Sequence, residues 1–163
     1  QTCALPICRP RPRLPVRAGF TLVEIMVVVV IIGLLASIAL PAIGRVRQSA
    51  QNSRFISDLR TFAQAFESYA SLNGAWPPNA GSGVVPTGMA GDFKEAAWIS
   101  RNSLGGRWNW DRNINGVSAG ISTTNVTVSD VQMIAIDRAI DDGDLEAGLF
   151  RRFSGRFTAI LEP

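Results

Sequence analysis

The chain has 163 residues, of which 47% are apolar, and 16 basic and 13 acidic side chains give it a formal net charge of +3. This length allows one compact domain with at most an appendage. The sequence contains no histidine, and both cysteines, Cys3 and Cys8, lie near the amino terminus. The rest of the chain therefore lacks the side chains for Ser-His-Asp or Cys-His catalysis, for a His/Cys zinc site and for a disulfide framework.

The first 19 residues are basic and contain no acidic side chain, whereas residues 20–163 carry 12 basic and 13 acidic side chains. The excess positive charge thus belongs to this tip, and we expect no nucleic-acid partner. The sequence does not begin with methionine, and Gln1 to Ile7 reads like a translated sequencing adapter. Residues 1–7 are either such an artefact, which we favour, or part of a genuine leader, and we expect residues 1–19 as a whole to be a leader outside the fold.

Phe20 to Leu40 is an apolar run of 21 residues whose only polar members are Thr21, Glu24 and Ser37. A helix of this length spans ~32 Å, enough to cross a bilayer core of ~30 Å. The run is longer than the apolar core of a cleaved secretory signal, and no small-residue cleavage site follows it. We therefore predict one retained membrane helix. Residues 1–19 are expected on the cytoplasmic side, because arginines that flank a membrane helix favour that side.

Glu24 is the one ionisable residue of that run. A charge at the centre of a bilayer costs at least ~2.5–3.5 kcal/mol on insertion scales, and such groups usually have a partner. No basic residue lies between Phe20 and Leu40. Either Glu24 stays hydrated near the interface, or its cation comes from outside the helix, such as the terminal amine of a neighbouring chain cut before Phe20.

The residues GFTLVE from Gly19 to Glu24, set between a basic leader and the apolar run, resemble the class III signal of type IV pilins and type II secretion pseudopilins. The resemblance implies that prepilin peptidase cleaves between Gly19 and Phe20 and that Phe20 is then N-methylated. It also implies that Glu24 neutralises the terminal amine of an adjacent subunit during assembly. The glycine and proline of the family fall on Gly33 and Pro41.

Pro41 has no N–H group, so we expect a kink or local melting of the helix near Leu40–Gly44. The resemblance implies that this stretch loses helicity when subunits pack into a filament, which Gly33, Pro41 and Gly44 would facilitate. A fixed bend is the alternative.

Beyond Gly44 the helix becomes amphipathic, because large apolar residues recur at steps of three and four: Phe55, Leu59, Phe62, Phe66 and Tyr69. This stripe is typical of a helix packed on a core. Asn73-Gly74 and then Pro77-Pro78 end the helix. We predict a helix from about Phe20 to Leu72, ~80 Å long, with a membrane half at 20–43 and an amphipathic half at 44–73.

Residues 74–163 are predicted to form a globular head. A Gly- and Pro-rich loop precedes a short helix within Asp92–Ser100. Asn115-Gly116 and Ser154-Gly155 each lie between alternating segments and predict hairpins. Between them, a capping box at Ser129–Gln132 predicts a helix to about Ile140. The fold expected is α+β, pilin-like, with the long helix packed against a small antiparallel sheet. The four tryptophans are expected in its core or in subunit contacts.

Four carboxylates crowd the segment DDGDLE: Asp141, Asp142, Asp144 and Glu146. Hard cations such as calcium prefer oxygen ligands, and carboxylates at this density repel one another without one. Major pseudopilins carry calcium in a carboxy-terminal loop, so the resemblance favours a calcium site. The alternative is a solvated turn after a helix.

The resemblance therefore implies a structural protein and not an enzyme: a type II secretion pseudopilus subunit in the inner membrane, with a periplasmic head. Its expected partners are copies of itself, prepilin peptidase, the assembly platform, minor pseudopilins and the bilayer. The absence of a cysteine pair near the carboxyl end favours this over a type IV pilus subunit. A membrane-tethered periplasmic enzyme or binding module is a third hypothesis, and it leaves Glu24 unexplained.

Overall fold

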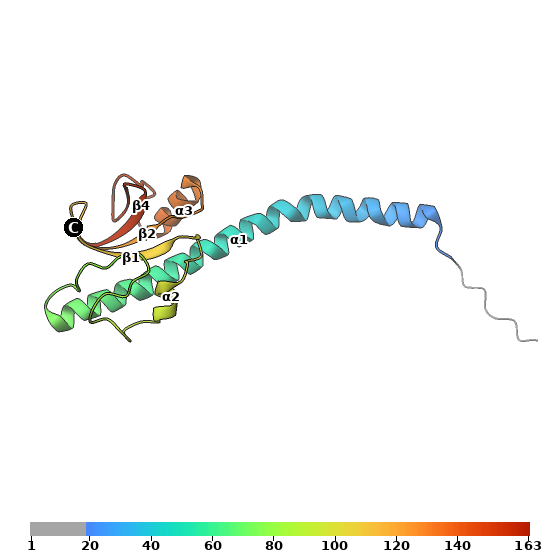
Figure 1. Ribbon diagram of the computed structural model, residues 1–163. Helices are drawn as coiled ribbons and strands as arrows, with labels where there is room; N and C mark the ends of the chain where they lie inside the picture. Colours follow the sequence, from blue (N-terminus) through green and yellow to red (C-terminus); the bar gives the residue numbers. More distant parts are fainter. Residues whose placement is uncertain (1–18) are drawn as a thin grey trace, which may run out of the picture. The chain divides into compact units, whose positions relative to one another are not determined.

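The structure is a computed structural model that describes residues 19–163 (Figure 1). The predicted leader, including the adapter-like heptad, lies outside the described residues except for Gly19. The chain divides into two compact units, residues 1–42 and 43–163. The second unit thus contains the amphipathic half of the predicted helix together with the predicted head.

A single helix, α1, runs from Leu22 to Asn73 and belongs to both units. It begins two residues later than predicted, because Thr21 caps it. In the first unit its apolar side chains are exposed, and an 18-residue window has a mean hydropathy of 2.8 with no residue buried. Of the helices in the described part of the chain, it alone is long and apolar enough to span a membrane.

The second unit adds two short helices and four strands: α2 (Glu95–Ile99), β1 (Arg107–Ile114), β2 (Val117–Thr124), α3 (Asp130–Ile140), β3 (Phe150–Phe153) and β4 (Arg156–Glu162). The strands form one antiparallel sheet in the order β1-β2-β4-β3. This confirms the α+β, pilin-like architecture.

Both predicted hairpins are confirmed, and their turns explain why they form. Asn115 and Gly116 between β1 and β2 have φ of 56° and 77°, and Ser154 and Gly155 between β3 and β4 have φ of 43° and 83°. Two successive residues with positive φ match the right-handed twist of the flanking strands. The α3 helix is also confirmed, since the side chain of Ser129 accepts a hydrogen bond from the backbone N–H of Gln132.

The core lies between α1 and the sheet. The predicted stripe supplies four buried side chains from α1: Phe55, Leu59, Phe62 and Phe66. Phe66 stacks on Trp110 at 4.0 Å between ring centroids, and Phe55 stacks on Trp108 at 4.8 Å. Offset stacking of this kind adds to the stabilisation from burying apolar area. Three of the tryptophans are fully buried, and Trp76 is partly buried.

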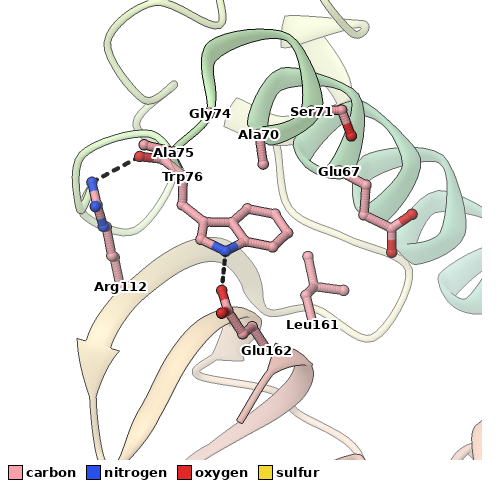
Figure 2. Close-up of a pocket in the computed structure, with 9 residues that line it drawn as sticks. All are labelled: Glu67, Ala70, Ser71, Gly74, Ala75, Trp76, Arg112, Leu161 and Glu162. Atoms are coloured by element: carbon pink, nitrogen blue, oxygen red, sulfur yellow. Dashed lines mark hydrogen bonds between the residues drawn. The ribbon is translucent and has the colours of Figure 1, made fainter.

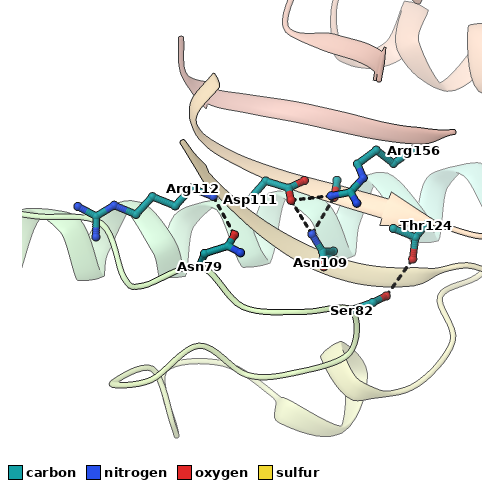
Figure 3. Close-up of polar contacts among 8 residues, drawn as sticks. Asn79, Ser82, Asn109, Asp111, Arg112, Thr124 and Arg156 are labelled. Carbon is teal, nitrogen blue, oxygen red and sulfur yellow. Dashed lines mark hydrogen bonds and ion pairs between the residues drawn. The ribbon is translucent and has the colours of Figure 1, made fainter. Parts of the chain in front are cut away.

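The other face of the sheet is polar (Figure 3). The side chain of Asp111 is only 3% exposed and pairs with Arg156 at 2.7 Å, while the amide of Asn109 donates to the same carboxylate oxygen. The loop after α1 is fastened to the sheet edge, because Asn79 accepts from the backbone N–H of Arg112 at 3.1 Å. This attachment holds the segment that follows α1 against β1.

Candidate functional site

The amino-terminal motif forms a capping box at the start of α1. The backbone N–H and the hydroxyl of Thr21 both donate to Glu24 Oε2, at 2.7 and 2.8 Å, and the N–H of Glu24 donates to Thr21 Oγ1 at 3.3 Å. This reciprocal pattern satisfies helix N–H groups that lack intrahelical partners. Sequence reasoning missed it, although Thr-x-x-Glu is its usual signature.

Capping does not neutralise Glu24. Within residues 19–163, no ion pair involves its carboxylate, and the hydrogen bonds found there use Oε2 alone. Gly19 and Phe20 precede the helix, and the side chain of Phe20 is 85% exposed. The structure therefore places the predicted cleavage site outside regular structure, one helical turn before a carboxylate with a free oxygen.

Gly33, Pro41 and Gly44 all lie within α1, whose backbone stays helical through them. No other group lies within 4 Å of where a β-carbon of Gly33 or Gly44 would stand. Melting during assembly therefore stays a prediction about the packed filament.

A group of three carboxylates gathers at the carboxyl end of α3: Asp137, Asp141 and Asp142, with one oxygen from each within 4.8 Å of the others. Asp137 is fully buried, and neither of its carboxylate oxygens has a hydrogen-bond partner. Burial raises the pKa of Asp137, and the charges of Asp142 and Asp141 raise it further, while the nearby backbone N–H of Gly143 opposes the shift. A buried, unpaired carboxylate is costly, so this site favours a bound cation or a proton.

The other two predicted ligands lie differently. Asp144 Oδ1 accepts from the backbone N–H of Glu146 at 3.1 Å. The carboxylate of Glu146 pairs with Arg152 at 2.9 Å, and Arg152 also pairs with Asp130 at 2.9 Å. The hydrogen bond that Arg152 donates to Glu146 and the charge of Asp130 raise the pKa of Arg152. Glu146 is thus engaged in an ion pair, whereas Asp141 and Asp142 face Asp137.

Asp137 was missed from the sequence, yet a signal was present. Met133 and Ile136 lie on the buried face of α3, and Asp137 falls on the same face. An acidic residue on an apolar helix face needs a partner or a proton. Gly148 supports the site, because it has φ of 69° and a β-carbon there would collide with the carboxylate of Asp141.

A second feature is a groove of about 700 Å³ at the carboxyl end of α1 (Figure 2). Its lining comes from α1, the following loop and the sheet: Glu67, Ala70, Ser71, Gly74, Ala75, Trp76, Arg112, Leu161 and Glu162. The indole N–H of Trp76 donates to Glu162, and Arg112 donates to the backbone carbonyl of Trp76 at 2.7 Å. Sequence analysis gave no indication of this groove.

Comparison with known proteins identifies the amino-terminal region. Residues 15–40 match the family profile of the prokaryotic N-terminal methylation motif. The fimbrial protein EcpC of Eikenella corrodens is 34% identical over 107 residues, which cover 65% of this chain and 69% of that protein. No solved structure matches the chain.

Two further relatives represent different branches. The type IV major pilin protein PilE1 of Neisseria gonorrhoeae is 40% identical over 67 residues, or 41% of this chain and 31% of the pilin. The type II secretion system core protein G of Klebsiella pneumoniae is 41% identical over 59 residues, or 36% of this chain and 42% of that protein. The chain thus matches less than half the length of either.

The chain belongs to the family of type IV pilins and type II secretion pseudopilins. Members of this family are structural proteins and not enzymes, and membership implies processing by prepilin peptidase and assembly into a filament. Together with the exposed apolar helix, the motif indicates a subunit anchored in a membrane before assembly.

Proposed function

We propose that this protein is a subunit of a type II secretion pseudopilus and that Glu24 pairs with the terminal amine of Phe20 on a neighbouring copy. The observation that carries the proposal is the carboxylate of Glu24, which lies near the start of an exposed apolar helix without a cationic partner among the described residues. Its capping bonds use Oε2 and leave Oε1 for a second group.

The energetics favour such a pair. A carboxylate and an ammonium group ~4 Å apart attract each other by ~4 kcal/mol at an effective dielectric constant of 20. This is enough to offset the cost of placing one charge in a bilayer, ~2.5–3.5 kcal/mol. A copy that packs out of register leaves both charges unpaired, so the pair also selects the correct register.

The arrangement in the cell follows from the charge and the apolar helix. The arginines before Gly19 keep the leader cytoplasmic, so α1 crosses the inner membrane once and the head lies in the periplasm. Prepilin peptidase cuts before Phe20, and the assembly platform then moves copies from the lipid into the filament, with minor pseudopilins as further partners.

A type IV pilus subunit is the second candidate, favoured by the likeness to the fimbrial protein EcpC and to PilE1. The lack of cysteine in residues 9–163 supports the secretion pseudopilus. Deleting the gene separates the two functions: loss of secreted proteins from the medium indicates a pseudopilus, whereas loss of surface fibres with normal secretion indicates a pilus.

We also propose that Asp137, Asp141 and Asp142 hold a calcium ion. Calcium takes six to eight oxygen ligands and is suited to clustered carboxylates. The fit rests on the unpartnered, fully buried Asp137 and on the proximity of the other two carboxylates. A bound cation would remove the repulsion among the three charges.

Replacing Glu24 tests the filament proposal. In cells with prepilin peptidase and the assembly platform, Glu24→Ala should insert into the membrane and be cleaved, but should form at least tenfold fewer filaments. We expect this because the amine of Phe20 loses its partner and a loss of ~1.4 kcal/mol per contact is a factor of ten. Filaments sheared from the cells and quantified by immunoblot provide the measurement.

Thr21→Ala is the matched control, because it removes the capping hydroxyl and leaves the carboxylate of Glu24 in place. It should assemble within about twofold of the wild type, because the cap, worth ~1 kcal/mol, stabilises the helix start in the free and the assembled subunit alike and is not a contact between copies. Wild-type filament levels in Glu24→Ala, or equal losses in both variants, would show that Glu24 serves as a cap and not as an assembly residue.

A further inference from the structure

The groove at the end of α1 has the chemistry of a guanidinium site. Trp76 lies beside Trp110, with ring centroids 5.6 Å apart and ring planes tilted by 42°, and its partly exposed indole lines the groove. The carboxylates of Glu67 and Glu162 come from α1 and β4 (Figure 2). An aromatic face binds a planar cation, and a carboxylate accepts two parallel N–H bonds from arginine.

The end of the helix contributes further negative potential. The last turn of α1 contains no basic residue, so the partial negative charge of its terminal carbonyl groups is not offset by a side chain. No ion pair within residues 19–163 involves Glu67 or Glu162. Arg112 lies on the far side of Trp76 from Glu67 and is bound to the Trp76 carbonyl (Figure 2).

The matching cations lie on the same helix, at the beginning of the second unit. Arg45 and Arg47 are exposed, and no ion pair in the described part of the chain includes either of them. The segment between Glu24 and Asp58 contains no acidic residue. About 30 Å of helix separates Arg47 from Glu67, at 1.5 Å per residue. Arg47 therefore cannot reach the groove of its own chain.

We propose that the groove binds Arg45 and Arg47 of a second copy of this chain, with a guanidinium over Trp76 and against Glu67. The contact joins two different surfaces of identical chains, and such head-to-tail contacts propagate as helical filaments when they do not close into rings. The inference rests on the proposed filament function and specifies which copies touch: those displaced along α1 by about 30 Å.

Charge reversal tests this contact in the full-length protein, in cells that carry the assembly machinery. The variant Arg45→Glu/Arg47→Glu, which reverses the two arginines, and the groove variant Glu67→Arg should each lower filament yield about fivefold. This corresponds to ~1 kcal/mol per contact. Combining all three substitutions should restore at least half of the lost yield. Arg60→Glu, an exposed reversal elsewhere on α1, should change the yield less than twofold and should not rescue Glu67→Arg.

Cysteine pairing gives a second readout, because residues 9–163 contain no cysteine. Val46→Cys lies between the two arginines and Ser71→Cys lines the groove. The double variant should form a ladder of disulfide-linked multimers in filaments, and Glu24→Ala should abolish that ladder.

The groove contact is overturned if filaments form with wild-type yield in both reversal variants, if the combination gives no rescue, or if filaments of the cysteine variant show no ladder. None of these results would contradict the proposal that the protein is a filament subunit. The proposed function fails separately, when Glu24→Ala leaves assembly unchanged.

Discussion

At the scale of single residues, Asp137 is the least expected feature of the head. Its neighbours on the buried face of α3 are apolar, yet its carboxylate is fully buried and both oxygens lack hydrogen bonds. A carboxylate in that position is stable only when a cation or a proton compensates its charge. The exposed carboxylates of Asp141 and Asp142 have oxygens within 4.8 Å of Asp137 and would supply the further oxygen ligands that a cation needs.

The calcium proposal predicts a thermal shift that depends on Asp137. Full-length protein in detergent, first treated with a chelator, should gain about 5–10 °C in unfolding midpoint when calcium is added at about 100 times its dissociation constant, because binding then stabilises the folded state by ~2.7 kcal/mol. Differential scanning fluorimetry measures the shift. Asp137→Asn should lose most of it.

Glu146→Gln is the matched control, since it removes one charge from the same loop but alters a side chain that pairs with Arg152. This variant should keep the calcium-dependent shift. A wild-type protein that does not respond to calcium, or an Asp137→Asn variant that responds fully, would contradict the site.

At the scale of secondary-structure elements, the amphipathic half of α1 packs against the sheet of the head through one stripe of mainly aromatic side chains. Phe66 is fully buried and touches Trp110 and Trp98, with centroids 4.0 and 5.4 Å away. Phe66→Ala should reduce the free energy of unfolding by about 3–5 kcal/mol, through lost burial and the cavity left behind. Urea denaturation followed by tryptophan fluorescence measures this change.

Leu72→Ala gives the comparison, because Leu72 lies on the same helix but is 83% exposed. Its effect should be under about 0.5 kcal/mol. Equal destabilisation by both substitutions would mean that the stripe does not carry the packing between α1 and the sheet.

The elements predicted correctly from the sequence are those whose signals are local. The α1 stripe repeats within single helical turns, the hairpins follow from Asn115-Gly116 and Ser154-Gly155, and Ser129 begins α3 through one cap. The Thr21–Glu24 capping box was equally local. It was missed because both explanations considered for Glu24, hydration near the interface and an external cation, concern its charge and not the backbone N–H groups at the helix start.

What could not be predicted depends on residues far apart in the chain. Pairing of β2 with β4 places β3 at the sheet edge, and no local pattern specifies that order. The groove depends on a bond between Trp76 and Glu162, 86 residues apart. The group of three carboxylates depends on how α3 packs, because that packing buries Asp137. The exclusion of Glu146 depends on its ion pair with Arg152 in β3.

At the scale of the whole molecule, the two units have opposite solvent requirements. The first exposes an almost continuous apolar helix, whereas the second has a closed core and a polar outer sheet face. The first unit needs lipid while the subunit is free, and it needs neighbouring apolar helices once the subunit is extracted. Assembly therefore exchanges one apolar environment for another, and under the proposed pairing of Glu24 with a terminal amine the charges at the helix start select which copies fit.

The proposed pairing predicts that assembly requires a cut before Phe20, because the cut creates the ammonium group with which Glu24 would pair. Mass spectrometry of purified filaments should find chains that begin at Phe20 with a methyl group on its nitrogen and without the arginine-rich leader. Replacing Gly19 by valine should leave the uncut chain in the membrane and out of filaments, because a branched side chain then occupies the position before the scissile bond. Gly33→Val, at a glycine whose surroundings are equally open, should still be cut. Filaments built from chains that keep the leader would show that the terminal amine has no part in assembly, since the charge of Glu24 would then be accommodated without it.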